Sequence, residues 1–281
     1  MQTQSWPRGG IEGEQAAPLA PCAERGDGRG GEAALRLDKR TYLDLEQGRI
    51  KVVLRDYGGG LGEVGWAFIP SRRPFNAGGG GGEPNEKNVD RACRRAQSRI
   101  RQLVLSANLD HLLTLTYRDN ITELRQASDD LRRFVRAVKT KLPGFLYVAV
   151  PERQKRGAWH WHLAVAGRQD VVLLRRLWLR VVGDGNIDVQ KPRSQHNRRL
   201  ALVRYLGKYL AKGFADEDKE LHRHRFRASL GIEVPSETIE IPEHMRGDVA
   251  AYAAAQLCER SGSVGFVWNE QALGVGWACS W

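Results

Sequence analysis

The sequence is poor in cysteine, and its cysteines form no recognisable pattern. Only four occur among 281 residues, scattered and with no CxxC pair. This spacing predicts reduced thiols in a cytoplasmic protein. The opening residues, MQTQSWPRGG, lack the apolar core of a signal peptide, and no apolar run approaches the length of a membrane helix. We therefore expect neither secretion nor insertion into a membrane.

A nucleotide-binding loop and a repeat of domain size are also absent from the sequence. Five consecutive glycines, Gly78 to Gly82, are followed by neither Lys-Ser nor Lys-Thr, so they do not form a phosphate-binding loop. Such a glycine run is typical of a flexible linker. The chain is long enough to bury a core without disulfide bonds or structural metals.

Basic residues are in clear excess. The chain has 44 Lys and Arg against 33 Asp and Glu, which gives a formal charge of +11 and a pI near 9.8. One interpretation of this excess is solubility. The other is a polyanionic partner, because each phosphate that a cation neutralises releases condensed counterions. Composition alone leaves both interpretations open.

Composition and periodicity divide the chain into four regions. Residues 1–35 are rich in Gly, Ala, Pro and charge, and we expect them to be disordered. Residues 36–87 are expected to hold short strands and the glycine linker. Residues 88–235 are expected to form the main domain. Residues 236–281 are expected to be an extension with one helix and three tryptophans that cover a core edge rather than stack on bases, namely Trp268, Trp277 and Trp281.

The main domain is predicted to be an α+β fold with an antiparallel sheet. Its strands and helices alternate in the order β-α-β-β-α-β, which is the arrangement of ferredoxin-like and RRM-like domains. In that topology the first and third strands are central neighbours, and the two crossover helices cover one face of the sheet. A further basic helix, at about residues 198–212, is expected to lie across the open face. The four strands are predicted at residues 111–117, 145–150, 158–166 and 186–190.

Two histidines are predicted to share the open face of this sheet. His160 and His162 flank Trp161 on a strand, so their imidazoles point to the same side and can bind one metal ion. Glu152 ends the preceding strand, and a hairpin places it opposite His160. Two imidazoles and one carboxylate leave open positions on Mg²⁺ or Mn²⁺. The alternatives are surface histidines and a Glu152 that pairs with nearby cations.

The last helix of the main domain repeats one pattern, Tyr205-Leu-Gly-Lys208 and then Tyr209-Leu-Ala-Lys212. Residues four apart share a helix face, so both phenols can meet the same site. A phenol titrates near pH 10, so a nucleophilic tyrosine needs a nearby cation or metal ion that favours the phenolate. We therefore count both lysines with the catalytic residues. The alternative is an amphipathic packing face whose lysines extend to water.

A second basic helix is predicted to begin near residue 88. Its apolar residues follow helical spacing, and arginines surround them. These arginines form either a solvated face or a face that follows DNA phosphates. The residues that we assign to DNA binding are Arg91, Arg94, Arg95 and Arg99 on this helix and Arg204 on the tyrosine helix.

Three segments carry a resemblance to a known family. HLLTLTY, GAWHWHLAV and VRYLGKYLAK stand in the order and spacing of the three motifs of rolling-circle replication initiators, the two-tyrosine members of the HUH endonuclease superfamily. The similarity covers about residues 88–235. Residues 225–231 also resemble the segment that follows the tyrosine helix in phage- and plasmid-type members. The resemblance implies that His160, His162 and Glu152 hold the metal and that the two tyrosines are nucleophiles.

The resemblance also implies an activity. Such enzymes nick single-stranded origin DNA, form a 5′-phosphotyrosine link and leave a free 3′-hydroxyl, and the second tyrosine allows rejoining. A separate helicase and replication machinery are expected as partners because the chain lacks a nucleotide-binding loop. Two alternatives stay open: a transposase of the same superfamily, and a non-catalytic DNA-binding regulator on the same fold. Conjugative relaxases are disfavoured because their tyrosine precedes the histidines.

Overall fold

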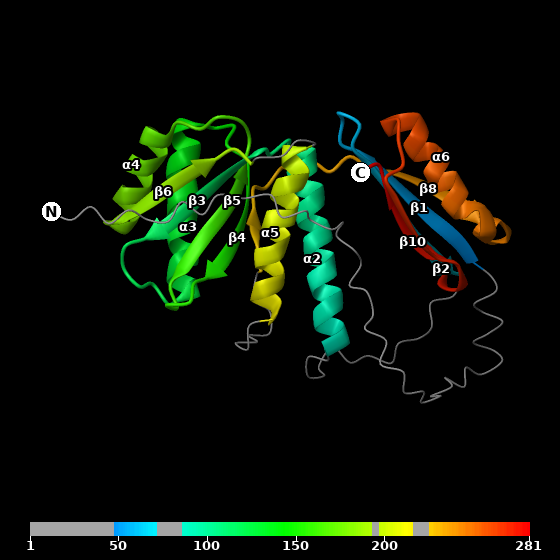
Figure 1. The fold of residues 1–281 in the computed structure, drawn as a ribbon, viewed down its shortest axis with the longest axis horizontal. Coiled ribbons are helices and arrows are strands. Elements are labelled where there is room, and N and C mark those ends of the chain that lie inside the picture. Colours follow the sequence, from blue (N-terminus) through cyan, green and yellow to red (C-terminus); the bar gives the residue numbers. More distant parts are fainter. Residues whose placement is uncertain (1–47, 72–85, 193–196, 216–224) are drawn as a thin grey trace. The chain divides into compact units, whose positions relative to one another are not determined.

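The computed structural model describes four stretches of the chain, 48–71, 86–192, 197–215 and 225–281 (Figure 1). The chain forms two compact units. The described part of unit 1 lies between residues 86 and 233, and unit 2 combines residues 48–71 with 234–281. The segment expected to be disordered, 1–35, and the glycine linker lie outside the described residues. No helix in the described stretches is long and apolar enough to cross a membrane.

Unit 1 is built on a five-stranded antiparallel sheet with the order β6-β3-β5-β4-β7. The first and third strands of the predicted topology, β3 and β5, are central neighbours, so the ferredoxin-like α+β fold is confirmed. The short strand β7 adds a fifth member beside β4. The strands are β3 (His111–Tyr117), β4 (Tyr147–Arg153), β5 (Trp159–Val165), β6 (Gly185–Gln190) and β7 (Arg227–Ala228).

Helices α3 (Leu124–Lys141) and α4 (Val171–Val182) cover one face of this sheet (Figure 1). Alternate strand residues such as Leu113 and Trp161 point to these helices and form the main core. Trp178 of α4 is fully buried and packs edge-on against Tyr117, with ring centroids 5.2 Å apart. Asp170 caps α4 by accepting a hydrogen bond from the backbone N–H of Leu173 at 2.9 Å, as its sequence predicts.

The opposite face of the sheet carries two helices, α5 (Arg198–Ala215) and α2 (Glu86–Ser106). They run side by side in Figure 1. The sequence predicted only α5 on this face. Helix α2 joins it because Ile100, Leu103 and Val104 form an apolar stripe that needs a partner surface, and all three are buried. The Gln97 side chain on α2 donates to the backbone carbonyl of Gly207 on α5 at 3.4 Å.

Unit 2 is a second five-stranded antiparallel sheet, with the order β8-β1-β2-β10-β9. Helix α6 (Val249–Ser261) packs against it. The regions 36–87 and 236–281 were treated as separate in the sequence, but β1 pairs with β8 and β2 pairs with β10. The strands are β1 (Gly48–Asp56), β2 (Gly62–Pro70), β8 (Glu237–Pro242), β9 (Phe266–Glu270) and β10 (Val275–Cys279), and the 3-10 helices are η1 (Glu243–Asp248) and η2 (Gln271–Leu273).

One tryptophan of unit 2 lies in the core and another lies at the surface. Trp66 is 5% exposed and belongs to the core that α6 covers. Its ring lies so close to Gly276 that a Cβ there would be 2.1 Å from Trp66 Cζ2, so this position requires glycine. Trp268 is 40% exposed. The expectation that the C-terminal tryptophans cover a core edge is therefore wrong for Trp268.

Candidate functional site

The two histidines of β5 point to the face of the sheet that carries α5. Strand pairing places Thr114 of β3 beside His162, and Glu152 of β4 opposite His160. The hairpin between β4 and β5 closes where the N–H of Gln154 donates to the carbonyl of Ala158 at 2.8 Å. The register that the sequence predicted for Glu152 is thus confirmed.

Helix α5 brings both tyrosines against one of the histidines. The Tyr209 ring stacks on His162 with centroids 4.4 Å apart and an interplanar angle of 24°. The Tyr205 ring meets His162 edge-on, with centroids 5.4 Å apart and an angle of 89°. The two phenol rings are themselves 4.8 Å apart. The one-turn spacing on the helix therefore gives a cluster of three aromatic rings.

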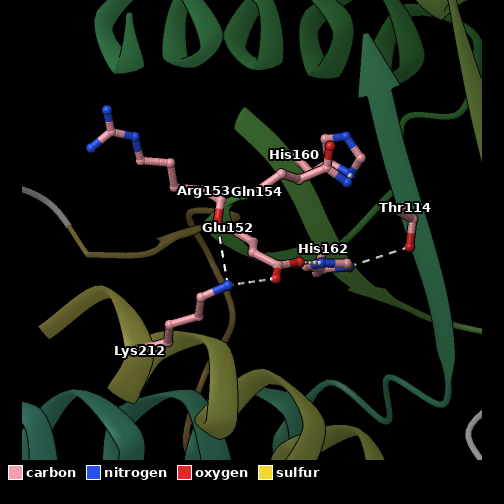
Figure 2. Close-up of polar contacts among 7 residues, drawn as sticks. All are labelled: Thr114, Glu152, Arg153, Gln154, His160, His162 and Lys212. Carbon is pink, nitrogen blue, oxygen red and sulfur yellow. Dashed lines mark hydrogen bonds and ion pairs between the residues drawn. The ribbon is translucent and has the colours of Figure 1, made fainter. Parts of the chain in front are cut away.

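Glu152 connects this cluster to the end of α5, as Figure 2 shows. Its Oε2 accepts a hydrogen bond from His162 Nε2 at 2.8 Å, and its Oε1 accepts one from Lys212 Nζ at 3.0 Å. Burial opposes ionisation of Glu152, but the bonds from His162 and Lys212 outweigh it, and its pKa is lowered. Lys208 is exposed and forms no hydrogen bond or ion pair with the other described site residues.

His160 is buried and only partly satisfied. The Gln154 side-chain amide donates to its Nδ1 at 3.2 Å, while its Nε2 has no hydrogen-bond partner among the described residues. Burial, together with the neighbouring His162, lowers the pKa of His160 to about 4. The ring is therefore neutral near pH 7, which is the form that a metal ligand needs.

The donor atoms at this site can be compared with the needs of a divalent ion. No group of three or more His, Cys, Asp or Glu side chains in the described stretches is arranged to hold a metal. Two donors do converge, because His162 Nε2 and Glu152 Oε2 are 2.8 Å apart. Neighbouring ligands of a small ion with bonds of ~2.1 Å lie about 3 Å apart. The buried Nε2 of His160 is a third, unused nitrogen.

The amide of Gln154 decides what His160 offers at that nitrogen. As placed, the amide donates to Nδ1, so the neutral ring carries its proton on Nε2. A rotation of the amide by half a turn would let it accept from Nδ1–H and leave a lone pair on Nε2. Thr114 needs no such change, since its hydroxyl, 3.3 Å from His162 Nδ1, can either donate or accept. With Gln154 rotated, the chemistry of the donor set fits a divalent cation.

One acidic residue near the tyrosines was not assigned from the sequence. Asp188 of β6 pairs opposite Thr114 and so points to the same face as the histidines. Burial, the Tyr209 hydroxyl, and the charges of Glu152 and Asp188 together raise the pKa of Tyr205. The alternation of Asp188 with Ile187 and Val189 was the signal that would have placed it on this face. Tyr205 is therefore a neutral phenol at rest.

The arginines assigned to DNA binding lie on the same side of the sheet as the tyrosines. All five are exposed, on α2 and α5, and these helices are neighbours. Their exposure fits both a phosphate-binding face and a solvated one, so their role stays a prediction. They are Arg91, Arg94, Arg95, Arg99 and Arg204.

The site and fold together define a basic α+β domain that presents two phenols and two imidazoles on one side of its sheet. Residues 110–214 match a family model of replication-associated proteins of the ORF2 type. This range covers β3 to α5 apart from the last residue of α5, and it contains all of the assigned histidines, tyrosines and lysines. Comparisons with curated proteins and with solved structures gave no match. The family match supports a replication-associated protein.

Proposed function

We propose that this protein is a replication initiator that cuts and rejoins single-stranded DNA through a tyrosyl ester. The observation that carries the proposal is the contact of both phenol rings with one imidazole that is itself bonded to Glu152. Phenols in a plain packing role would not need a polar, partly unsatisfied cluster beneath them. The match to replication-associated proteins over this segment supports the same conclusion.

In the proposed reaction, one tyrosine oxygen forms a bond to the scissile phosphorus as the bond from phosphorus to the 3′ oxygen breaks. The leaving 3′ oxygen takes a proton and becomes a free hydroxyl. The tyrosyl ester keeps the free energy of the phosphodiester, so the reverse attack by a 3′-hydroxyl rejoins DNA without ATP. The second tyrosine provides a nucleophile for a second cut while the first is still esterified.

We assign the metal to His160, His162 and Glu152, with Mg²⁺ or Mn²⁺ as the ion. A bound divalent ion would polarise the scissile phosphate and stabilise charge that develops on it. Lys212, which bonds Glu152 at 3.0 Å, would hold the carboxylate in place. Lys212 also follows Tyr209 by about one helical turn, where a cation favours the phenolate.

The DNA partner is proposed to be a single strand bound across α2 and α5. The exposed arginines of these helices would contact phosphates, while the rings of Tyr205 and Tyr209 lie on the adjoining side of α5. Because the sequence has no phosphate-binding loop, strand separation is assigned to a separate helicase.

The proposal is tested by trapping the covalent product. Purified protein is incubated with Mn²⁺ and single-stranded oligonucleotides that tile the DNA around its gene, labelled at either the 5′ or the 3′ end. We expect an adduct that survives boiling in detergent, and only with the 3′ label, because the protein joins the 5′ end of the downstream fragment. Tight binding without any adduct would instead indicate a DNA-binding regulator in which the Lys212–Glu152 ion pair is structural.

A further inference from the structure

The sheet of unit 2 has a face that points away from its core. Ile50, Val52 and Leu54 of β1 belong to the core that α6 covers, so the alternate positions of each strand form the opposite face. We call this opposite face the outer face. Residues that strand pairing places on it include Lys51, Gly65, Ala67, Trp268 and Trp277.

Aromatic rings occupy one side of the outer face. Trp268 on the edge strand β9 is 40% exposed and lies directly opposite Trp277 on β10. The Trp277 ring is 5.9 Å from Phe266 and 6.1 Å from Trp281, measured between centroids. The result is a patch of four aromatic residues drawn from β9, β10 and the C-terminal end of the described chain.

The position of Trp277 is fixed from below. Its indole Nε1 donates to Oε2 of Glu63 at 3.2 Å, and the Tyr57 hydroxyl donates to the other carboxylate oxygen at 2.7 Å. Glu63 is 1% exposed, so this is a buried, hydrogen-bonded carboxylate rather than a surface contact. A ring that is held in place before a ligand arrives loses little conformational entropy on binding.

Small residues separate the aromatic side of the face from a basic side. Gly65 and Ala67 of β2 lie between β10 and β1, and a Cβ on Gly65 would approach Trp277 Cδ1 no closer than 3.9 Å. Lys51 on β1 is exposed and forms no ion pair among the described residues. Two strand spacings, roughly 10 Å, separate the β1 and β10 rows. A nucleotide and an extended lysine side chain together can bridge that distance.

The overall charge of the outer face is balanced. Glu63 is buried and bonded, and Glu240 pairs with Arg49 at 3.0 Å. Attraction to phosphate is therefore weak, and any nucleic acid held here must be held mainly through its bases. The charged residues that pairing places on this face are Arg49, Lys51 and Arg55 against Glu63, Glu240 and Glu270.

We propose that the outer face of unit 2 binds single-stranded nucleic acid by stacking unpaired bases on Trp268 and Trp277, with Lys51 beside the backbone. Exposed indoles suit this ligand because every base has a flat π face, whereas a duplex hides its bases within the stack. This is a second DNA contact, separate from the tyrosines of unit 1. It would hold a separated strand without discriminating its sequence.

The test measures binding of the full chain to labelled oligothymidylate by fluorescence anisotropy. EDTA is present, so no cutting takes place and the result does not depend on the proposed nicking. The buffer contains about 0.5 M NaCl, where the screening length falls to roughly 4 Å and phosphate contacts are weakened. We expect Trp268→Ala to weaken binding by roughly tenfold and Trp268→Phe to keep most of it. A duplex of the same length should bind weakly under these conditions.

Three controls decide between this proposal and its rivals. Circular dichroism and a thermal melt confirm that Trp268→Ala is folded, which is expected because the side chain is exposed. Photo-crosslinking with 5-iodouracil oligonucleotides should label a peptide from residues 264–281; labelling confined to α5 would overturn the proposal. Unchanged affinity of Trp268→Ala at high salt would also overturn it. A loss of self-association in place of a loss of DNA binding would assign the face to a second copy of the chain.

Discussion

The two units share one construction principle and differ in what their surfaces offer. Each is a five-stranded antiparallel sheet packed against helices. The described part of unit 1 has 28 Lys and Arg against 12 Asp and Glu, whereas that of unit 2 has 5 against 8. The positive charge of the described chain thus belongs to the unit that carries the histidines and tyrosines. Unit 2 offers aromatic rings in place of charge.

This difference suggests a division of labour in how DNA is held. Cations bind phosphates at long range, without regard to sequence, and with a strong dependence on salt. Aromatic rings bind only bases that are already unpaired, and salt affects them little. A protein that acts on one separated strand gains from both, because the first brings the strand in and the second discriminates against duplex. The following predictions separate the two contributions.

The largest effect is expected from removing both phenol oxygens in unit 1. Tyr205→Phe together with Tyr209→Phe keeps both rings and their contacts with His162, so DNA affinity should stay nearly unchanged. The covalent adduct should disappear completely, as seen on a denaturing gel. Tyr252→Phe, on α6 of unit 2, is the matched control and should form the adduct normally. An adduct that persists in the double variant would mean that another residue is the nucleophile.

Replacing one imidazole should reduce cutting without removing it. His162→Ala deletes the ring that contacts Glu152, Thr114 and both tyrosines. We expect the rate of adduct formation to fall by roughly 100-fold or more, and its response to added Mn²⁺ to flatten. The rate is measured over a range of Mn²⁺ concentrations. The control is His244→Ala, an exposed histidine of unit 2; an undiminished metal response in His162→Ala would refute the ligand role.

A change in the core of unit 2 should leave the chemistry of unit 1 intact. Gly276→Ala puts a Cβ where Trp66 Cζ2 lies 2.1 Å away, and relief of that overlap should cost roughly 1–3 kcal/mol of stability. Urea unfolding followed by tryptophan fluorescence measures the loss. Gly65→Ala, whose Cβ meets no atom closer than 3.9 Å, should unfold like the wild type. If Gly276→Ala also abolishes the adduct under native conditions, the two units do not act separately.

Buried histidine should make unit 1 less stable in acid. His160 has a pKa of about 4 in the folded chain, against an ordinary value of 6.5, so the unfolded chain takes up its proton first as the pH falls. Stability is therefore lost between pH 6.5 and pH 4, and this group should contribute a loss of about 2 kcal/mol at pH 5 relative to pH 7. Urea unfolding in EDTA at both pH values measures it. In His160→Gln this part of the pH dependence should vanish; if it persists, another group is responsible.

Local patterns predicted most of unit 1 because its elements follow one another along the chain. Strand alternation placed His160, His162 and Glu152 on one face, and helix spacing placed Tyr205 beside Tyr209. The position of α2 was not predicted, since an amphipathic stripe shows that a helix packs but not on what. Gln154 carried no signal either, because its contact with His160 depends on the shape of a hairpin.

Unit 2 was harder to predict because its sheet joins distant segments. The stretches that form β1 and β8 are separated by all of the described part of unit 1, and no local pattern encodes that pairing. The tryptophans illustrate the same limit. Trp66 and Trp268 both lie on apolar, strand-like segments, and only the pairing decides that one is in the core and the other exposed.

The smallest effect concerns how strongly each unit depends on salt. Arg95→Ala together with Arg99→Ala removes two exposed cations from α2. If each contacts one phosphate of a single strand, the slope of log affinity against log salt should become shallower by about 0.7 per arginine. The slope is measured by anisotropy with an oligonucleotide between low and moderate salt. Trp268→Ala should lower affinity at every salt concentration and leave this slope alone.

A pair of arginines on α3 provides the control for this last comparison. Arg125→Ala with Arg136→Ala removes the same charge from exposed positions, but α3 covers the opposite face of the unit 1 sheet. If phosphates follow α2 and α5, the α3 pair should leave the slope nearly unchanged. An equal change from both pairs would mean that net charge alone attracts DNA. The arginines of α2 would then be a solvated face, and the alignment of the strand with the tyrosines would depend on the aromatic residues.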